Sequence, residues 1–163
     1  MVAILEFGPH SLEALMNRPQ TPLTVASTSI AREAAARLID AARAACHDIG
    51  IEATIAVTDA GGHLKALDRT DSAPFLTVDV AIDKAWTAAS FGLGTHVWSD
   101  IVKDPVVAQL AHRPRLVAVG GGCPIVHEGR VVGGIGISGG NALQDQQAAE
   151  IALKAVGFDI APA

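Results

Sequence analysis

Three short apolar runs separated by glycines occupy residues 115–139, and this feature limits the possible folds more than any other. The runs are RLVAVGGG, CPIVHEG and RVVGGIGISG, and Glu128 and Gly129 between the last two have the composition of a tight turn. Strands that follow one another through tight turns pair in antiparallel fashion, whereas parallel strands need a long crossover connection. The pattern therefore predicts antiparallel strands and excludes a doubly wound nucleotide-binding fold.

The remaining segments predict one further hairpin and four helices. Residues 53–60 (ATIAVTDA) and 63–69 (HLKALDR) are expected to form two antiparallel strands joined by a glycine pair. Helical spacing of apolar residues runs through 23–49, 74–91, 97–110 and 141–157. The predicted order is α-ββ-αα-βββ-α. We expect an α+β fold, an α/β sandwich in which helices cover the faces of a five-stranded antiparallel sheet.

The first 22 residues differ from the rest of the chain in their proline content. Pro9, Pro19 and Pro22 interrupt any helix or strand, so we interpret residues 1–22 as an extension and residues 23–163 as a single domain. A chain of 163 residues is long enough for one domain with its own core. Because it has four Phe, two Trp and no Tyr, that core must be built from Ala, Val, Ile and Leu.

Charge and hydropathy argue against several kinds of partner. The net charge is −5 and lysines and arginines do not cluster, so neither nucleic acid nor an anionic membrane is an expected partner. No apolar run approaches the ~20 residues of a membrane span. Cys46 and Cys123 lie far apart and outside any zinc-type spacing, which argues against a disulfide framework or a structural zinc site. We expect a cytoplasmic protein.

His63 and His96 are the first candidate functional residues. His63 follows the glycine turn of the predicted hairpin, with Asp59 across from it. That arrangement suits an imidazole held in one tautomer, as an axial metal ligand or a general base. The alternative is a solvated polar residue at a hairpin tip. His96 has the same two interpretations, and it opens a helix whose backbone N–H groups attract anions.

Lys84 and Cys123 are also open to two interpretations. In the Ala-rich stretch DKAWTAASFG, Lys84 is either a solvated lysine or a functional one that faces a ligand carboxylate or acts as a catalytic amine. Cys123 is either a small buried residue or a soft metal ligand. The glycine stretches around them lack the phosphate-loop pattern GxxxxGK[ST]. We therefore interpret these glycines as sites of tight turns and close backbone approach.

Four segments occur in the order typical of a known family. They are VTDAGGHLKALDRTDSA, DKAWTAASFGLGTH, GGGCPIVHEGRVVGGIGISGG and QDQQAA. Together they resemble the GlcG/HbpS family, and most closely its branch of PduO C-terminal domains. The resemblance covers roughly residues 23–157, and only the N-terminal extension lies outside it.

The resemblance implies a fold, an assembly and a ligand. The fold is an α/β sandwich with a central antiparallel sheet, the assembly is a homo-oligomer of two or more copies, and the ligand is haem or a related tetrapyrrole. We expect the subunit interface to include the helix around Trp86. Among the positions that match the family pattern, those that we expect to bind the ligand are Asp59, Arg69, Lys84, Thr87, Gly121, Gly122, Ser138 and Asp145, with His96 matching the PduO-like branch. His63 and Cys123 join them as candidates.

Two functions compete for the expected pocket. The first is a small-molecule binding protein that takes haem, a related tetrapyrrole or another carboxylate-bearing ligand near a subunit interface. His63 or His96 would contact the iron, and Arg69 and Lys84 would meet carboxylates. The second is a cofactor-independent catabolic enzyme, a tautomerase, isomerase or lyase, with His63 or Lys84 as base, Asp59 as its partner and Arg69 as anion holder. A third possibility is an oligomeric scaffold in which these residues only stabilise subunit contacts.

Overall fold

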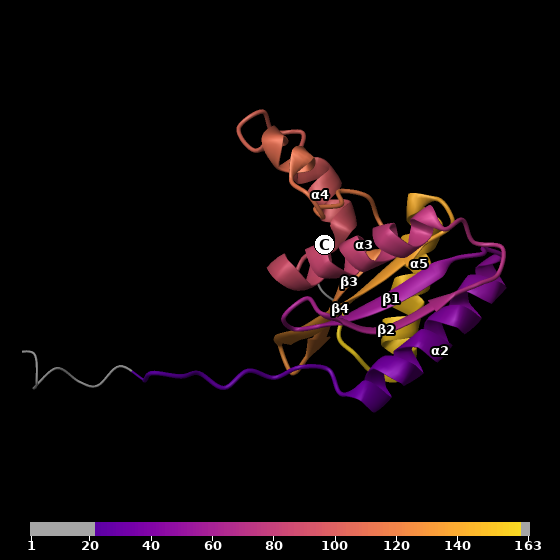
Figure 1. Ribbon diagram of the computed structural model, residues 1–163, viewed down its shortest axis with the longest axis horizontal. Helices are drawn as coiled ribbons and strands as arrows, with labels where there is room; N and C mark the ends of the chain where they lie inside the picture. The colour runs from indigo at the N-terminus through magenta and orange to yellow at the C-terminus, as the bar shows by residue number, and fades with distance from the viewer. Residues whose placement is uncertain (1–21, 161–163) are drawn as a thin grey trace, which may run out of the picture.

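The computed structural model describes residues 22–160, which form an α+β fold (Figure 1). In chain order the elements are α2 (Arg32–Ile49), β1 (Thr54–Asp59), β2 (Leu64–Arg69), α3 (Leu76–Phe91), α4 (Thr95–Ile101), the 3₁₀ helix η1 (Ala108–His112), β3 (Gly122–His127), β4 (Arg130–Ser138) and α5 (Ala142–Val156). The predicted extension, apart from its last residue, lies outside the described residues. Within residues 22–160, no helix is both long enough and apolar enough to cross a membrane.

The strands of residues 22–160 form one antiparallel sheet in the order β2-β1-β4-β3. The predicted hairpin is confirmed, because β1 pairs with β2 and the amide of Asp59 donates to the carbonyl of His63 at 2.9 Å. A second hairpin joins β3 to β4 through Glu128 and Gly129, both at positive φ. Helix α3 covers one face of the sheet, and α2 and α5 lie side by side on the other (Figure 1). The predicted sandwich of helices on an antiparallel sheet is therefore confirmed.

The prediction of five strands is wrong, because the sheet has four and residues 115–119 do not pair with it. Their backbone hydrogen-bonds to Thr87 of α3 instead. The Thr87 hydroxyl donates to the carbonyl of Arg115 and accepts from the amide of Val117, both at 3.1 Å. Arg115 also takes a φ of +71°, which interrupts an extended strand. The observed order is α-ββ-αα-ββ-α, with η1 before the last pair of strands.

Two predicted helices are shorter in the structure. The first begins at Arg32 instead of residue 23. The amide of Ile30 donates to the carbonyl of Val132 at 2.8 Å, so the chain before the helix is held extended beside β4. The helix predicted over 97–110 is divided into α4 and η1. Pro105 lies between them, and a proline disfavours the helical conformation of the residue before it.

The main hydrophobic core lies between the sheet and the pair α2 and α5. It consists of aliphatic and small side chains, as the composition predicts. The largest of these that are fully buried are Leu38, Ile55, Val57, Ile125, Ile135, Ile137 and Leu153. Alternation along β1 and β4 directs Ile55, Val57, Ile135 and Ile137 to this face. The residues between them in sequence therefore face α3.

Helix α3 approaches the sheet through glycines. A Cβ on Gly134 or Gly136 of β4 would overlap the backbone carbonyl oxygen of Ala85 or Ala81, respectively. A Cβ on Gly122 of β3 would meet the carbonyl oxygen of Lys84 at 2.6 Å. The absence of side chains at these positions lets the helix backbone lie almost directly on the strands. This close approach brings the side chain of Lys84 to the end of β4.

Candidate functional site

A cleft of about 540 Å³ lies between α4, residues 118–120 and the start of α5. It is lined by His96, Ser99, Ala118, Val119, Gly120, Ala142, Leu143, Gln146 and Glu150. Two of these apolar residues, Val119 and Leu143, leave 50% and 82% of their surface exposed. A concave and mostly apolar surface with a few polar groups is typical of a small-molecule site. This cleft is therefore the candidate site.

His96 separates the cleft from a smaller hollow that is lined in part by Gly94, Cys123 and Pro124. Its Nδ1 atom is buried and has no hydrogen-bond partner within residues 22–160. The same holds for Nε1 of Trp98, which does not line the cleft. A buried polar atom without a partner costs ~1–3 kcal/mol unless a ligand or water supplies one. Because Nδ1 lies against Gly94, which lines the smaller hollow and not the cleft, the hydrogen bonding of His96 is incomplete on the side of that hollow.

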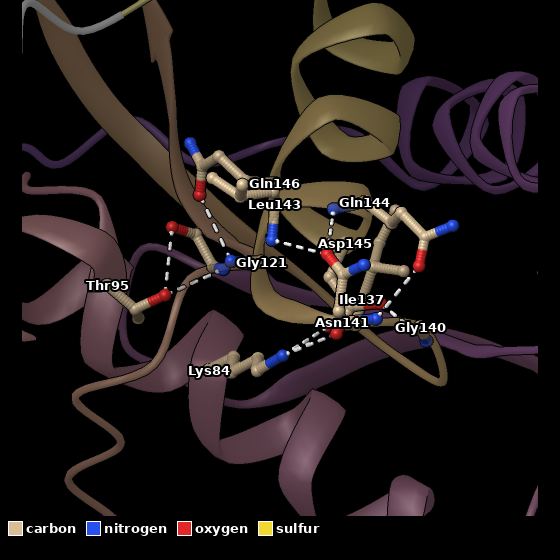
Figure 2. A network of polar contacts seen from close by, with 11 residues as sticks. Lys84, Thr95, Gly121, Ile137, Gly140, Asn141, Leu143, Gln144, Asp145 and Gln146 are labelled. Atoms are coloured by element: carbon tan, nitrogen blue, oxygen red, sulfur yellow. Dashed lines mark hydrogen bonds and ion pairs between the residues drawn. The ribbon is translucent and has the colours of Figure 1, made fainter. Parts of the chain in front are cut away.

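Next to the cleft, Lys84 and Asp145 form a buried ion pair, each only 2% exposed (Figure 2). Nζ of Lys84 donates to Oδ2 of Asp145 and to the carbonyl of Ile137, both at 2.8 Å. The other carboxylate oxygen of Asp145 accepts the amide of Gly140 at 2.9 Å. This network joins α3, the end of β4 and the first turn of α5. Lys84 is thus not solvated, and its amino group already has two protein partners.

The glycines before β3 pack tightly against this ion pair. Gly121 takes a φ of +114°, and a Cβ there would lie 2.8 Å from Nζ of Lys84 and 2.6 Å from Cβ of Asp145. Its amide donates to Oε1 of Gln146 at 3.0 Å. The amide of Gly122 donates to the hydroxyl of Thr95 at 2.8 Å (Figure 2). The predicted close backbone approach is therefore observed, and it holds residues 120–122 between α4 and α5.

The start of α5 is fixed by its cap. The side chain of Asn141 accepts the amides of Leu143 and Gln144, and the Gln144 side chain accepts the amide of Asn141 at 3.1 Å, which completes a capping box. One turn later, Nε2 of Gln146 donates to Oε1 of Glu150 at 2.8 Å and to Sγ of Cys123 at 3.2 Å. The cap therefore sets the position of the cleft-lining residues of α5.

Cys123 is buried, and its Sγ accepts the hydrogen bond from Gln146. Burial raises the pKa of its thiol to about 12, and the nearby carboxylate of Glu150 acts in the same direction. A thiol in this state is a weak metal ligand, because the thiolate is the ligating form. Within residues 22–160, no group of three or more His, Cys, Asp or Glu side chains is arranged to hold a metal ion.

A second polar pair lies at the tip of the β1–β2 hairpin. Oδ1 of Asp59 accepts the amides of Gly61 and His63 at 2.9 Å and lies 3.2 Å from Nδ1 of His63. Partial burial by itself raises the pKa of Asp59, but these hydrogen bonds and the nearby imidazole outweigh it and hold that pKa below its ordinary value. The side chain of His63 is 82% exposed and lines none of the clefts described above.

The other candidates are distributed between the two ends of the sheet. Arg69 and Ser138 both pair with Thr54 at one end of β1, whereas Asp59 and His63 lie at the other. A six-residue strand is ~20 Å long. The structure therefore separates His63 from Arg69 within one chain. Of the predicted site residues in the described part of the chain, His96 alone lines the cleft. Behind its wall lie Gly121, Gly122, Cys123, Lys84 and Asp145, while Thr87 supports residues 115–117.

Sequence reasoning missed the residues of α5 that line the cleft. Leu143, Gln146 and Glu150 follow one another at intervals of three and four residues, so they share one face of the helix. That spacing could have identified these three residues as one face of the helix. Nothing in the sequence showed that Val119 faces the same cleft, because its segment resembles a strand.

Comparisons with known proteins agree with this architecture. A family model described as "Haem degrading protein HbpS-like" matches residues 30–154. The chain is 34% identical over 141 residues to an uncharacterized 15.0 kDa protein from the dhaT-dhaS intergenic region of Citrobacter freundii, which covers 85% of this chain and 96% of that protein. It is 30% identical over 123 residues to the corrinoid adenosyltransferase PduO of Salmonella typhimurium. That match covers 74% of this chain but 37% of PduO.

A solved structure of PduOC in complex with haem has the same fold. Its TM-score to this chain is 0.75 at 26% sequence identity, and the match covers 83% of this chain and 100% of the PduOC chain. The matches confirm the resemblance inferred from the four sequence segments.

Proposed function

The chain belongs to the HbpS-like family, and from that membership we propose that it is a binding protein for haem or a related tetrapyrrole. The haem complex of PduOC, which has the same fold, supports this proposal. The site that we assign to the ligand is the cleft between α4 and α5, with His96 at its wall.

One observation carries the assignment: the side chain of His96 lines a mostly apolar cleft of about 540 Å³. Apolar walls suit the faces of a flat macrocycle, and Ala118, Val119 and Leu143 supply them. A bound haem would supply an iron that can bind an imidazole nitrogen. The residues present therefore fit the group, with His96 as its metal contact.

The buried polar network has a supporting part in this proposal. Lys84 and Asp145 are enclosed and bonded to each other, so they act on the ligand through the shape of the cleft. They fix Gly121 and the first turn of α5, between which the cleft opens. Precise positioning of a site by bonded neighbours is a general requirement for tight binding.

Substitution of the apolar wall tests the assignment. Leu143→Glu places a carboxylate where the macrocycle would pack, and burying that charge without a partner is unfavourable. We expect haem affinity, measured by the Soret absorbance during titration, to fall at least about tenfold, which corresponds to ~1.4 kcal/mol. Ile151→Glu, on the same helix but outside the cleft, is the matched control and should bind as the wild type does. Equal affinity of the two variants would place the ligand elsewhere.

We also propose that the protein is a homo-oligomer with its ligand site near a subunit interface, and that the interface includes α3 around Trp86. Two large apolar residues at the start of this helix, Phe75 and Leu76, are exposed in the single chain. Exposed apolar surface of this kind marks interaction sites.

A second candidate function is a cofactor-independent enzyme that acts on a small anionic substrate, and the Asp59–His63 pair favours it. The carboxylate orients the imidazole through Nδ1, which leaves Nε2 for proton transfer. On this alternative, proton exchange of small carboxylate-bearing enols, followed by NMR, should fall ~10²- to 10⁴-fold in His63→Ala. Exchange with the wild type no faster than in buffer would remove this candidate.

A further inference from the structure

Residues 22–29, hereafter the N-terminal arm, form an extended segment that makes few contacts with the rest of the chain. Every residue of the arm is exposed, and none belongs to a helix or strand. Leu23 is 100% exposed and Val25 is 85% exposed. Figure 1 shows the arm leaving the body of the molecule and running away from it. Two apolar side chains are thus held in water in the single chain.

Among the hydrogen bonds within residues 22–160, those of the arm are made by its last residue, Ser29. The hydroxyl of Ser29 accepts the amide of Ala60 at 3.1 Å and lies 3.5 Å from the carbonyl of Val132. Ile30, the next residue, is buried and donates to the same carbonyl. The direction of the arm is therefore set by contacts with the ends of β1 and β4.

The sequence of the arm, PLTVASTS, suits a β-strand. It combines β-branched residues with alternating apolar positions at Leu23 and Val25, and it carries no charge. Pro22 stands at its beginning, where a strand tolerates a proline. In the described part of the chain, no strand pairs with the backbone of the arm.

One edge of the sheet offers such a partner. Strand β2 is an edge strand, and Leu64 and Leu67 on it are 49% and 40% exposed. The opposite edge, β3, is partly occupied, because Asp159 forms a bridge to Val126. An edge strand presents unpaired N–H and C=O groups that can bind an added strand.

We propose that the N-terminal arm of one copy adds to the free edge of β2 in a second copy as a fifth strand. The partner is another copy because the arm runs away from the body of its own chain (Figure 1). Fully extended, eight residues reach ~26–29 Å, which exceeds the ~20 Å length of the six-residue β2. The added strand buries Leu23 and Val25 and covers the exposed side of β2. It also satisfies backbone groups of both segments.

Mixed disulfides test the pairing between copies. Untagged Val25→Cys protein is mixed with tagged Leu67→Cys protein under mild oxidation, and disulfide-linked species are identified by mass. The native Cys46 and Cys123 are buried and do not compete. We expect a disulfide between tagged and untagged chains, and we expect Ala26→Pro in the Val25→Cys chain to abolish it. The absence of that species, or equal yield with Ile151→Cys in place of Leu67→Cys, would overturn the proposal.

Hydrogen exchange on the otherwise wild-type chain provides a second readout. Ala26→Pro removes one backbone donor from the arm, which an unpaired segment tolerates and a β-ladder does not. Ala26→Ser keeps the donor and is the matched control. We expect amides of β2 to exchange at least tenfold faster in Ala26→Pro than in Ala26→Ser, with the amides of α5 unchanged. Equal exchange of β2 in the two variants would contradict the pairing.

Discussion

Asp145→Ala is expected to lower the free energy of unfolding by about 3–5 kcal/mol, because it leaves the buried Lys84 without its counter-ion. The substitution also removes the acceptor of the Gly140 amide, so the first turn of α5 loses a contact. Domain stabilities are ~5–15 kcal/mol, so this loss is a large part of the total. Urea unfolding followed by circular dichroism measures it.

Two controls separate burial of the pair from loss of charge alone. Asp100→Ala breaks the exposed ion pair with Lys103 and should change stability far less, because water and salt screen an exposed pair. Replacing both members of the buried pair, with Lys84→Met and Asp145→Leu together, should be less destabilising than Asp145→Ala, because no unpaired charge remains. If Asp145→Ala and Asp100→Ala cost the same, the buried pair does not support the fold as described.

Gly136→Ala is expected to destabilise the protein by more than the ~1–3 kcal/mol of ordinary overpacking. The added methyl group would overlap the carbonyl oxygen of Ala81, which belongs to the helix backbone. No side-chain rotation relieves such an overlap, so the whole of α3 has to move away from β4. Because α3 carries Lys84, the ion pair with Asp145 would be disturbed as well.

Gly129→Ala is the matched control for this substitution. Gly129 has a φ of +72° and no atom near the position of an added Cβ, so alanine there causes only left-handed backbone strain, about 1–2 kcal/mol. Thermal melting of both variants compares the two effects. A melting temperature of Gly136→Ala equal to or above that of Gly129→Ala would show that α3 does not lie as close to β4 as described.

Local patterns in the sequence predicted the fold where local chemistry decides the structure. The glycine turn of the first hairpin and the tight turn at Glu128 and Gly129 are examples, because each depends on residues a few positions apart. The prediction that RLVAVGGG forms a strand failed because the backbone of this segment bonds to Thr87, a residue 28 positions from Arg115 in the chain. The predicted start of α2 was wrong for a similar reason, since the amide of Ile30 donates to the carbonyl of Val132 in β4.

The candidate site was only partly visible in the sequence. The family resemblance selected Lys84, Asp145 and Gly121, and the structure brings them together in one network. The same reasoning grouped Arg69 with His63, which the sheet places at opposite ends of a strand. Distances of this kind depend on strand register and on which end of the sheet a residue occupies. Neither can be derived from residue types alone.

If the cleft beside His96 holds the tetrapyrrole, an absorbance titration of histidine variants will show it. Haem is added to the wild type, to His96→Ala and to His63→Ala, and the Soret band is recorded for each. His63 is the matched control, because it is the other candidate ligand and lies at the exposed hairpin tip. We predict that His63→Ala gives the wild-type spectrum and affinity, whereas His96→Ala loses or shifts the band with its melting curve intact. A wild-type spectrum and affinity in His96→Ala would contradict the account.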